Sequence, residues 1–207
     1  MIEKLKQLFR LEKAVEPTVL EKIDEMFANL KEDTLGIRIG EDLVSFGMDI
    51  CEMVGDIRSE MVNNTGFILP PVHIFSDETL QENEYVIQVL DEDMCHGFAV
   101  PNKEGLKEIS LKFKEIILDN IEKVLTNEVA EKYIDTAQKT NGWLIWALCG
   151  RVTSPEIKII LVDILKSGHS IKNISHIFEK IGNKILVNNK YYESDPHKIS
   201  HDIIKEL

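Results

Sequence analysis

Positively charged residues are outnumbered by negatively charged ones in this sequence. Its 207 residues include 24 lysines and arginines against 36 aspartates and glutamates, which gives a formal net charge of −12 at pH 7. Because nucleic acids and anionic membrane surfaces attract basic patches, this balance argues against either as the main partner. Long apolar runs are missing too, since the two longest, 143–149 and 157–165, are well short of the roughly 20 residues that span a bilayer. We therefore expect no nucleic-acid partner and no direct membrane insertion.

Cysteines and cofactor motifs are also few. Cys51, Cys95 and Cys149 are odd in number and widely separated, without a C-x-x-C pair, which indicates reduced thiols. The N-terminus interleaves charged and apolar residues and lacks the apolar core of a signal peptide. No phosphate-binding loop, dinucleotide-binding motif or G-x-S-x-G motif occurs. We expect a cytoplasmic protein with no cofactor, no bound metal and no catalytic residues.

What the sequence does contain is a firm backbone signal between Gly66 and Phe75. Upstream, apolar residues recur at three- and four-residue spacing over about 47–63, which indicates a helix with one buried stripe. Gly66 suits the left-handed residue that often ends a helix. Pro70 and Pro71 then force an extended backbone, and the next four residues are rich in β-branched and aromatic side chains. The segment predicts a helix that ends and leads directly into a strand.

The periodicity of apolar residues divides the chain into four parts and predicts an α+β fold. A small mixed sheet with helices, with strands near 35–39, 72–75, 85–90 and 94–100, is followed by an all-helical subdomain. The four parts are an N-terminal helical segment (1–32), an α/β subdomain (33–105), a helical subdomain (106–183), and a hairpin with a C-terminal helix (184–207).

Capping and turn residues place several element ends. An apolar stripe from about 109 to 125 predicts one long helix, and Thr126 begins the next. Ser154 precedes a proline and Ser170 precedes another apolar stripe, so each serine is the predicted N-cap of a helix. The acidic run 91–93 predicts the turn of a hairpin over 85–100.

Two blocks of motifs carry a family resemblance. The first reads G-F-x-x-P-P-V-x-I at 66–74 and N-E-Y-x-I at 83–87, and the second reads S-I-x-N-I at 170–174. Together they resemble the cytoplasmic domain of the FHIPEP family, the export-gate component of flagellar and virulence-associated type III secretion systems in bacteria. The residues that carry the resemblance as a structural signature are Gly66, Phe67, Pro70, Pro71, Tyr85, Ser170, Ile171 and Asn173.

The resemblance implies a non-enzymatic protein-binding or scaffold module in protein transport. The sequence has no counterpart of the family's membrane half, and between Val100 and about Leu106 it skips the second subdomain. We therefore expect a reduced form of the domain that is a monomer or small oligomer. Its partners would be export components or another protein machine, and an adaptor for an ATPase-containing machine outside secretion is the alternative.

A cysteine- or metal-dependent hydrolase is an alternative from a different class. Cys95 and His96 are the one adjacent thiol and imidazole, but neighbours on a strand point to opposite faces, so we expect a packed Cys95 and an outward His96. His197 and His201 are four residues apart on a predicted helix and could form half of a zinc site. Because the spacing fixes no further ligand, we expect surface histidines.

Two aromatic regions are candidates for contact with a partner. Trp143 and Trp146 lie in an apolar run, which we expect to be core between the flanking helices, with an interaction surface as the alternative. Phe75, Tyr85 and Val89 belong to predicted strands and form a possible partner surface, where an edge strand could accept an added strand.

Overall fold

The computed structural model describes residues 33–187 and 195–207. The chain divides after Glu32, and the account below concerns the unit Asp33–Leu207. The helical segment predicted for 1–32 lies outside the described residues.

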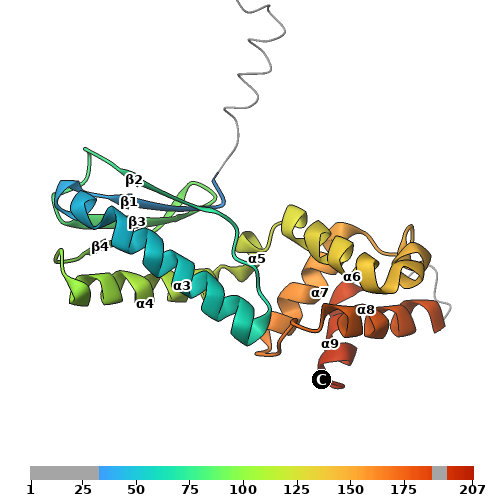
Figure 1. Cartoon of the computed structure of the whole chain (residues 1–207). Coiled ribbons are helices and arrows are strands. Elements are labelled where there is room, and N and C mark those ends of the chain that lie inside the picture. The colour runs from blue at the N-terminus through green and yellow to red at the C-terminus, as the bar shows by residue number, and fades with distance from the viewer. Residues whose placement is uncertain (1–32, 188–194) are drawn as a thin grey trace, which may run out of the picture. The chain divides into compact units, whose positions relative to one another are not determined.

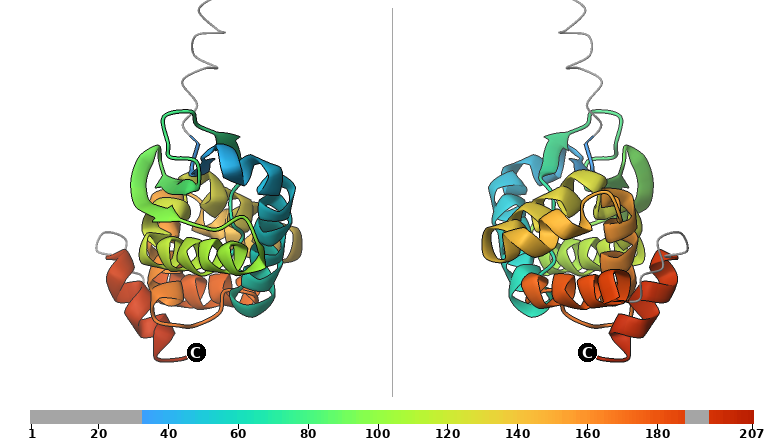
Figure 2. Two further views of the ribbon diagram at one scale, coloured as in Figure 1. Left: turned by 90° about the vertical axis from the view of Figure 1, so that its left-hand side faces the viewer. Right: turned by 90° about the vertical axis from the view of Figure 1, so that its right-hand side faces the viewer.

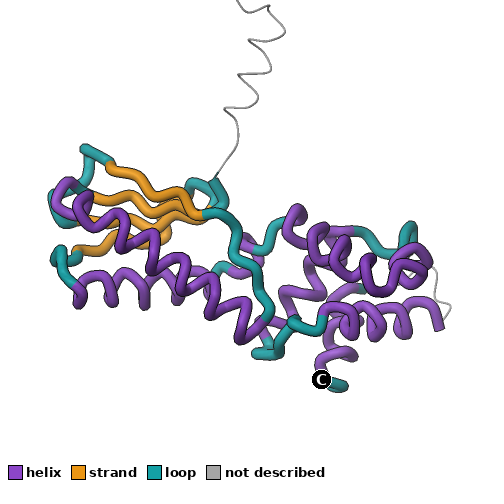
Figure 3. Tube along the Cα trace, in the orientation of Figure 1, coloured by secondary structure: helices purple, strands orange, loops and turns teal. Residues whose placement is uncertain are grey.

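Four strands form a mixed sheet (Figures 1 and 3). The strand β1 (Leu35–Ile39) runs parallel to β2 (Val72–Ser76) and antiparallel to β3 (Glu84–Val89), and β4 (Glu92–Phe98) pairs with β3, in the order β2-β1-β3-β4. The helix α3 (Gly47–Thr65) follows the short 3-10 helix η1 (Glu41–Phe46) and joins the parallel pair. The α+β fold predicted from the sequence is confirmed.

In the described part of the chain, six α-helices follow the sheet. The helix α4 lies beside α3 over one face of the sheet (Figure 1), and α6, α7, α8 and α9 pack against one another in the second part of the chain (Figure 2). Their bounds are α4 (Lys103–Asp119), α5 (Ile121–Val124), α6 (Asn127–Leu148), α7 (Ser154–Lys166), α8 (Ile174–Gly182) and α9 (Pro196–Ile204).

The segment from Gly66 to Pro71 has the predicted form. Gly66 ends α3 in the left-handed region with φ of 77°, and Pro70 and Pro71 lead directly into β2. Phe67 is buried, and a guanidinium nitrogen of Arg58 in α3 donates to the carbonyl of Leu69 in the same segment. The helix end, the loop and the strand are therefore fixed by backbone geometry and by packing together.

The helical part of the chain also binds this segment. The Tyr133 hydroxyl on α6 accepts from the backbone N–H of Ile68 (2.8 Å) and donates to the carbonyl of Gly66 (2.7 Å). The backbone N–H of Ile171 donates to the carbonyl of Thr65 (2.7 Å). Burial raises the pKa of Tyr133 to about 12, which reflects a phenol enclosed by protein.

The hairpin turn is shorter than predicted. Leu90 and Asp91 alone connect β3 to β4, and both have positive φ (51° and 58°), as in a type I′ turn. The expectation of a turn over 91–93 is therefore wrong. Glu92 and Asp93 belong to β4, where the Asp93 carboxylate accepts a hydrogen bond from the Arg38 guanidinium of the sheet at 2.6 Å.

Several helix starts also differ from the predicted ones. The N-cap of α7 is Thr153, not Ser154, because Thr153 forms a reciprocal capping box with the N3 glutamate. The N-cap of α8 is Asn173, not Ser170, because the Asn173 side chain accepts from a backbone N–H of the first turn. Thr126 caps α6 as predicted, but the stripe over 109–125 spans two helices.

The hairpin predicted at the start of 184–207 is wrong in its first half. Asn183–Val187 forms a turn of π-helix that continues from α8, and Ile185 within it is buried in the core. The packing of this apolar side chain outweighs the alternation that suggested a strand. The second half of the hairpin lies outside the described residues, and α9 follows as predicted.

Candidate functional site

The two tryptophans of α6 lie on the surface. Trp143 and Trp146 are 75% and 74% exposed, so the expectation that they form core is wrong. They are three residues apart and share one face of the helix beyond a kink at Asn141. The apolar residues of the same run that do enter the core are Ile145 and Leu148.

The sequence did hold a signal for this orientation. Counting three and four residues along a helix, Ala137, Ile145 and Leu148 fall on one face, and all three are buried. Trp143 and Trp146 fall on the other face. The run is apolar on both faces of the helix, so its composition alone does not distinguish the buried face from the exposed one.

A hollow lies beside the tryptophans. It has a volume of about 600 Å³ and is lined by Trp143, Trp146, Ala147, Cys149, Arg151 and Leu186. Aromatic rings next to an arginine are the side chains most enriched at the centres of protein interfaces. The residues Trp143, Trp146, Ala147, Cys149, Arg151 and Leu186 are called the tryptophan surface below.

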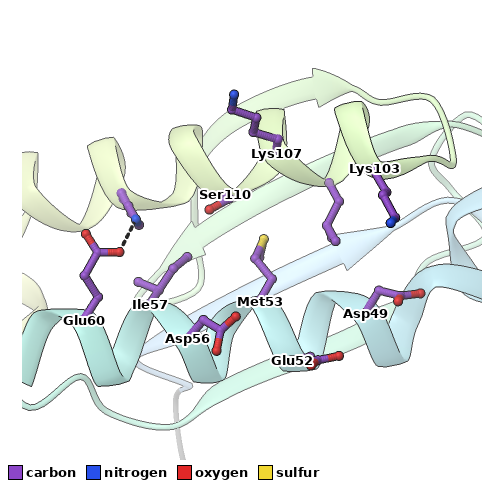
Figure 4. Close-up of a pocket in the computed structure, with 11 residues that line it drawn as sticks. Asp49, Glu52, Met53, Asp56, Ile57, Glu60, Lys103, Lys107 and Ser110 are labelled. Atoms are coloured by element: carbon purple, nitrogen blue, oxygen red, sulfur yellow. Dashed lines mark hydrogen bonds and ion pairs between the residues drawn. The ribbon is translucent and has the colours of Figure 1, made fainter.

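A groove of about 300 Å³ separates α3 from α4 (Figure 4). Its apolar floor includes Met53 and Ile57, whose side chains point from α3 toward α4 in Figure 4, and Leu106. Charged residues line its sides: carboxylates of α3 on one side (Asp49, Glu52, Asp56 and Glu60) and lysines of α4 on the other (Lys103, Lys107 and Lys114). These residues together are called the α3–α4 groove below.

One ion pair crosses this groove. The Lys114 ammonium binds the Glu60 carboxylate at 2.5 Å, at the end of the groove far from Lys103 and Asp49 (Figure 4). In the part of the chain that the structure describes, the other charged residues of the groove form no ion pair. The α3–α4 groove therefore presents charges of two signs to solvent.

The outer face of the sheet is polar and centres on Arg38. Its guanidinium binds Asp77 (2.7 Å) and Asp93 (2.6 Å). Hydrogen bonds from Thr79, and then the neighbouring Arg38, hold the pKa of Asp77 below its usual value. Hydrogen bonds from the backbone of Gln81 and from His96 lower the pKa of Glu84 in the same way. Among the described residues, the Arg38 Nε is buried without a hydrogen-bond partner, but the other charged groups bind one another, which indicates a structural role.

Only one member of the expected partner surface on the sheet is exposed. Phe75 is opposite Arg38 on the outer face and is 36% exposed. Tyr85 and Val89 are 2% and 0% exposed, because strand alternation turns them toward the face that the helices cover. Burial raises the pKa of Tyr85 to about 12. Tyr85 and Val89 are thus core residues and cannot contact a partner.

The thiol and imidazole on β4 are not brought together. Cys95 packs against the hydrophobic core, and the exposed His96 binds Glu84 (2.9 Å) on the outer face of the sheet. The strand thus directs the two side chains to opposite faces, as its alternation predicts.

The helix α9 holds the histidine pair that resembles half a zinc site. His197 binds the Asp163 carboxylate of α7 at 2.8 Å, and the buried Ser200 hydroxyl donates to the same oxygen at 2.5 Å. The carboxylate lies between serine and histidine, whereas a nucleophilic triad needs the histidine in the middle. His201 is exposed, and within 33–187 and 195–207 no three histidine, cysteine or carboxylate side chains gather as metal ligands would.

The structure brings the two signature blocks into contact. Gly66 lies against the backbone of Lys172, so close that a Cβ added at Gly66 would be 2.5 Å from the Lys172 nitrogen. Ile171 binds the residue before Gly66, and Asn173 caps α8. The signature residues thus meet where the sheet with its helices joins the helical part, except Tyr85, which lies in the sheet.

Comparison with known families identifies the class of protein. A sequence model of the FHIPEP family matches residues 3–107, which is 105 of the 207 residues. The chain belongs to the FHIPEP family, the family of the type III secretion export gate. No curated protein matches the chain in sequence. Across the described part of the chain, the structure contains no helix with both the length and the apolar character to cross a bilayer.

Solved structures share the fold. The CdsV protein of Chlamydia pneumoniae is 12% identical, and the match covers 82% of this chain and 65% of CdsV with a TM-score of 0.69. The structure of CdsV in complex with CdsO matches with a TM-score of 0.68. MxiA of Shigella flexneri is 14% identical, and the match covers 84% of this chain and 62% of MxiA with a TM-score of 0.64. The nonameric SctV-C of EPEC is 13% identical, covers 83% of this chain and 64% of its own, and has a TM-score of 0.67. This chain thus spans less than two thirds of each relative's length.

Proposed function

We propose that this protein is a non-enzymatic binding or scaffold module of type III protein export that works in the cytoplasm by contact with other proteins. Membership of the FHIPEP family supports the link to export. The tryptophan surface supports the mode of action and is the observation that carries the proposal.

Exposure of two tryptophans is costly unless another protein covers them. Each carries a large apolar surface, and Trp143 and Trp146 leave about three quarters of it in water. Buried tryptophan and arginine side chains commonly dominate the binding energy of an interface. The tryptophan surface combines both residue types beside a hollow that can receive a side chain of a partner.

The first partner to test comes from a relative. CdsV has been solved in complex with CdsO, so we take the counterpart of CdsO in the same genome as the candidate partner. The experiment measures its affinity for the purified protein by calorimetry. Wild type should bind, and Trp143→Ala/Trp146→Ala should weaken binding at least about tenfold, as loss of interface hot spots does.

A matched control uses exposed leucines elsewhere. Leu111 and Leu118 of α4 are 60% and 56% exposed, and Leu111→Ala/Leu118→Ala should leave the affinity unchanged. Equal binding by the tryptophan variant and wild type would remove the tryptophan surface from the proposal. If wild type binds neither this partner nor any other export component of the genome, the proposed role in export is wrong.

The oligomeric state is a separate part of the proposal. SctV-C of EPEC is nonameric, whereas the absence of a second subdomain after Val100 leads us to propose a monomer or small oligomer. Light scattering of the purified protein decides between these states, and a nine-membered assembly would contradict the proposal.

A further inference from the structure

The α3–α4 groove separates its charges by sign. The carboxylates at 49, 52, 56 and 60 follow the three- and four-residue spacing of one helical face. The lysines at 103, 107 and 114 are four and seven residues apart, which also places them on one face of α4. Apolar side chains of Met53, Ile57 and Leu106 lie between the two rows.

Most charges of the two rows form no ion pair with the opposite row. Asp49 and Lys103 lie at one end of the groove and Glu60 at the other, so the two helices run parallel (Figure 4). Ion pairs along the whole length would have closed the groove, yet the Glu60–Lys114 pair closes one end alone. Three carboxylates and two ammoniums stay available to charges on another molecule.

The dimensions fit a helix. Eleven residues separate Asp49 from Glu60, and at about 1.5 Å per residue each row extends over about 16 Å, or three helical turns. A third helix that lies along the groove repeats its side chains at the same spacing, so its charges meet a row on each side. Because Met53 and Ile57 are already buried in the core, its apolar stripe lies mainly against the half-buried Leu106 between the rows.

We propose that the α3–α4 groove binds an amphipathic helix of a partner protein, in which basic residues flank one side of an apolar stripe and acidic residues flank the other. The basic flank lies against Asp49, Glu52 and Asp56, and the acidic flank lies against Lys103 and Lys107. The inference rests on the proposed function as a protein-binding module, but it uses a surface that shares no residue with the tryptophan surface.

The test uses designed peptides of roughly 18 residues, about five helical turns, each held helical by the same side-chain staple. The mixed probe has a leucine stripe with lysines on one flank and glutamates on the other. Three comparison probes keep the stripe and carry glutamine, lysine alone or glutamate alone on both flanks. Fluorescence anisotropy measures binding to the full chain, and the mixed probe should bind about tenfold tighter than the glutamine probe.

Charge reversal of one row makes the test specific. Lys103→Glu/Lys107→Glu gives both sides of the groove negative charge, so the mixed probe should bind about tenfold more weakly and the lysine probe more tightly. Lys139→Glu/Lys198→Glu changes the net charge equally at exposed sites on α6 and α9 and should alter neither affinity. If the first variant does not fold, Asp49→Lys/Glu52→Lys/Asp56→Lys makes both sides positive and should favour the glutamate probe.

Several results would overturn the inference. Equal binding of the mixed and glutamine probes would mean that the charges play no part. If the lysine probe binds most tightly both to wild type and to Lys139→Glu/Lys198→Glu, binding follows net charge alone. That result would mean unspecific attraction between the basic peptide and the acidic protein. Loss of the mixed probe in Trp143→Ala/Trp146→Ala would place it on the other surface. All of these outcomes are independent of whether the counterpart of CdsO binds.

Discussion

Two apolar segments of the chain differ in how their aromatic side chains are buried. In Gly66–Pro71, Phe67 is 1% exposed and side chains of both parts of the described unit bind the backbone. In the run at 143–148, Trp143 and Trp146 remain in solvent although the chain around them is equally apolar. The first segment buries Phe67 and Leu69 and has its backbone bound by other side chains, although Ile68 is exposed, whereas the second presents one face to the core and both tryptophans to water. Apolar content alone therefore does not decide burial.

Truncation of Phe67 should have the largest effect. Phe67→Ala leaves a cavity beneath the junction, and we expect a loss of about 3–5 kcal/mol in the free energy of unfolding, measured by urea denaturation. The adjacent Ile68 is 48% exposed and provides the control, because Ile68→Ala should cost less than about 1 kcal/mol. Similar losses for the two variants would show that the junction is not packed as described.

The junction was predictable because its signals are local. Gly66 favours a left-handed residue and Pro70 fixes its own φ wherever the surrounding chain goes, so the helix end and the strand follow from these residues alone. Strand alternation likewise placed Cys95 and His96 on opposite faces. Which face the helices cover is a tertiary property, and so the exposure of Tyr85 and Val89 was mispredicted.

The candidate site was less predictable because it depends on distant residues. The groove needs α3 beside α4, with Glu60 opposite Lys114, and no spacing within either helix fixes that pairing. The exposure of the tryptophans did have a local signal in the helical spacing of Ile145 and Leu148, but the kink at Asn141, whose φ of −130° and ψ of 51° depart from helical values, had none. Nothing local requires a kink at an asparagine.

Replacement of Gly66 should separate backbone geometry from contact. Gly66→Ala puts a methyl group 2.5 Å from the backbone nitrogen of Lys172 at a φ of 77°, and we expect a loss of about 3 kcal/mol or more. Gly150 has a similar φ of 79° with no atom near the added Cβ, so Gly150→Ala should cost only about 1–2 kcal/mol. Thermal and urea unfolding measure both. Equal costs would mean that Lys172 moves away freely.

Removal of the Tyr133 hydroxyl should have a smaller effect. Tyr133→Phe takes the acceptor from the Ile68 N–H and the donor from the Gly66 carbonyl, and at pH 7 we expect a loss of about 1–2 kcal/mol in the free energy of unfolding. Thr136→Val, on the exposed side of α6, removes a hydroxyl that binds only its own helix and should cost less. If Tyr133→Phe has the same free energy of unfolding as wild type, water contributes no less to stability than the hydroxyl does and accepts the hydrogen bond of the Ile68 N–H in its place.

The advantage of Tyr133 over phenylalanine should depend on pH. Burial raises its pKa to about 12, above the unfolded value near 10, so between these values the unfolded chain loses the proton while the folded protein keeps it. Deprotonation then favours unfolding, and the contribution of the phenol is complete below about pH 10 and falls as the pH rises toward 12. Urea unfolding at pH 8 and pH 11 should show the difference between wild type and Tyr133→Phe shrinking, whereas a constant difference would contradict the buried phenol.

The smallest effect on stability is expected at the tryptophan surface. Because both side chains are about three quarters exposed, Trp143→Ala/Trp146→Ala should change the free energy of unfolding by no more than about 1 kcal/mol. Ile145→Ala, in the same turn of α6 but buried, should cost about 2–5 kcal/mol. A large loss in the double tryptophan variant would show that the two rings pack as core. Unchanged stability with weakened partner binding instead assigns the rings to recognition, since a side chain that does not hold the fold together is free to serve an interface.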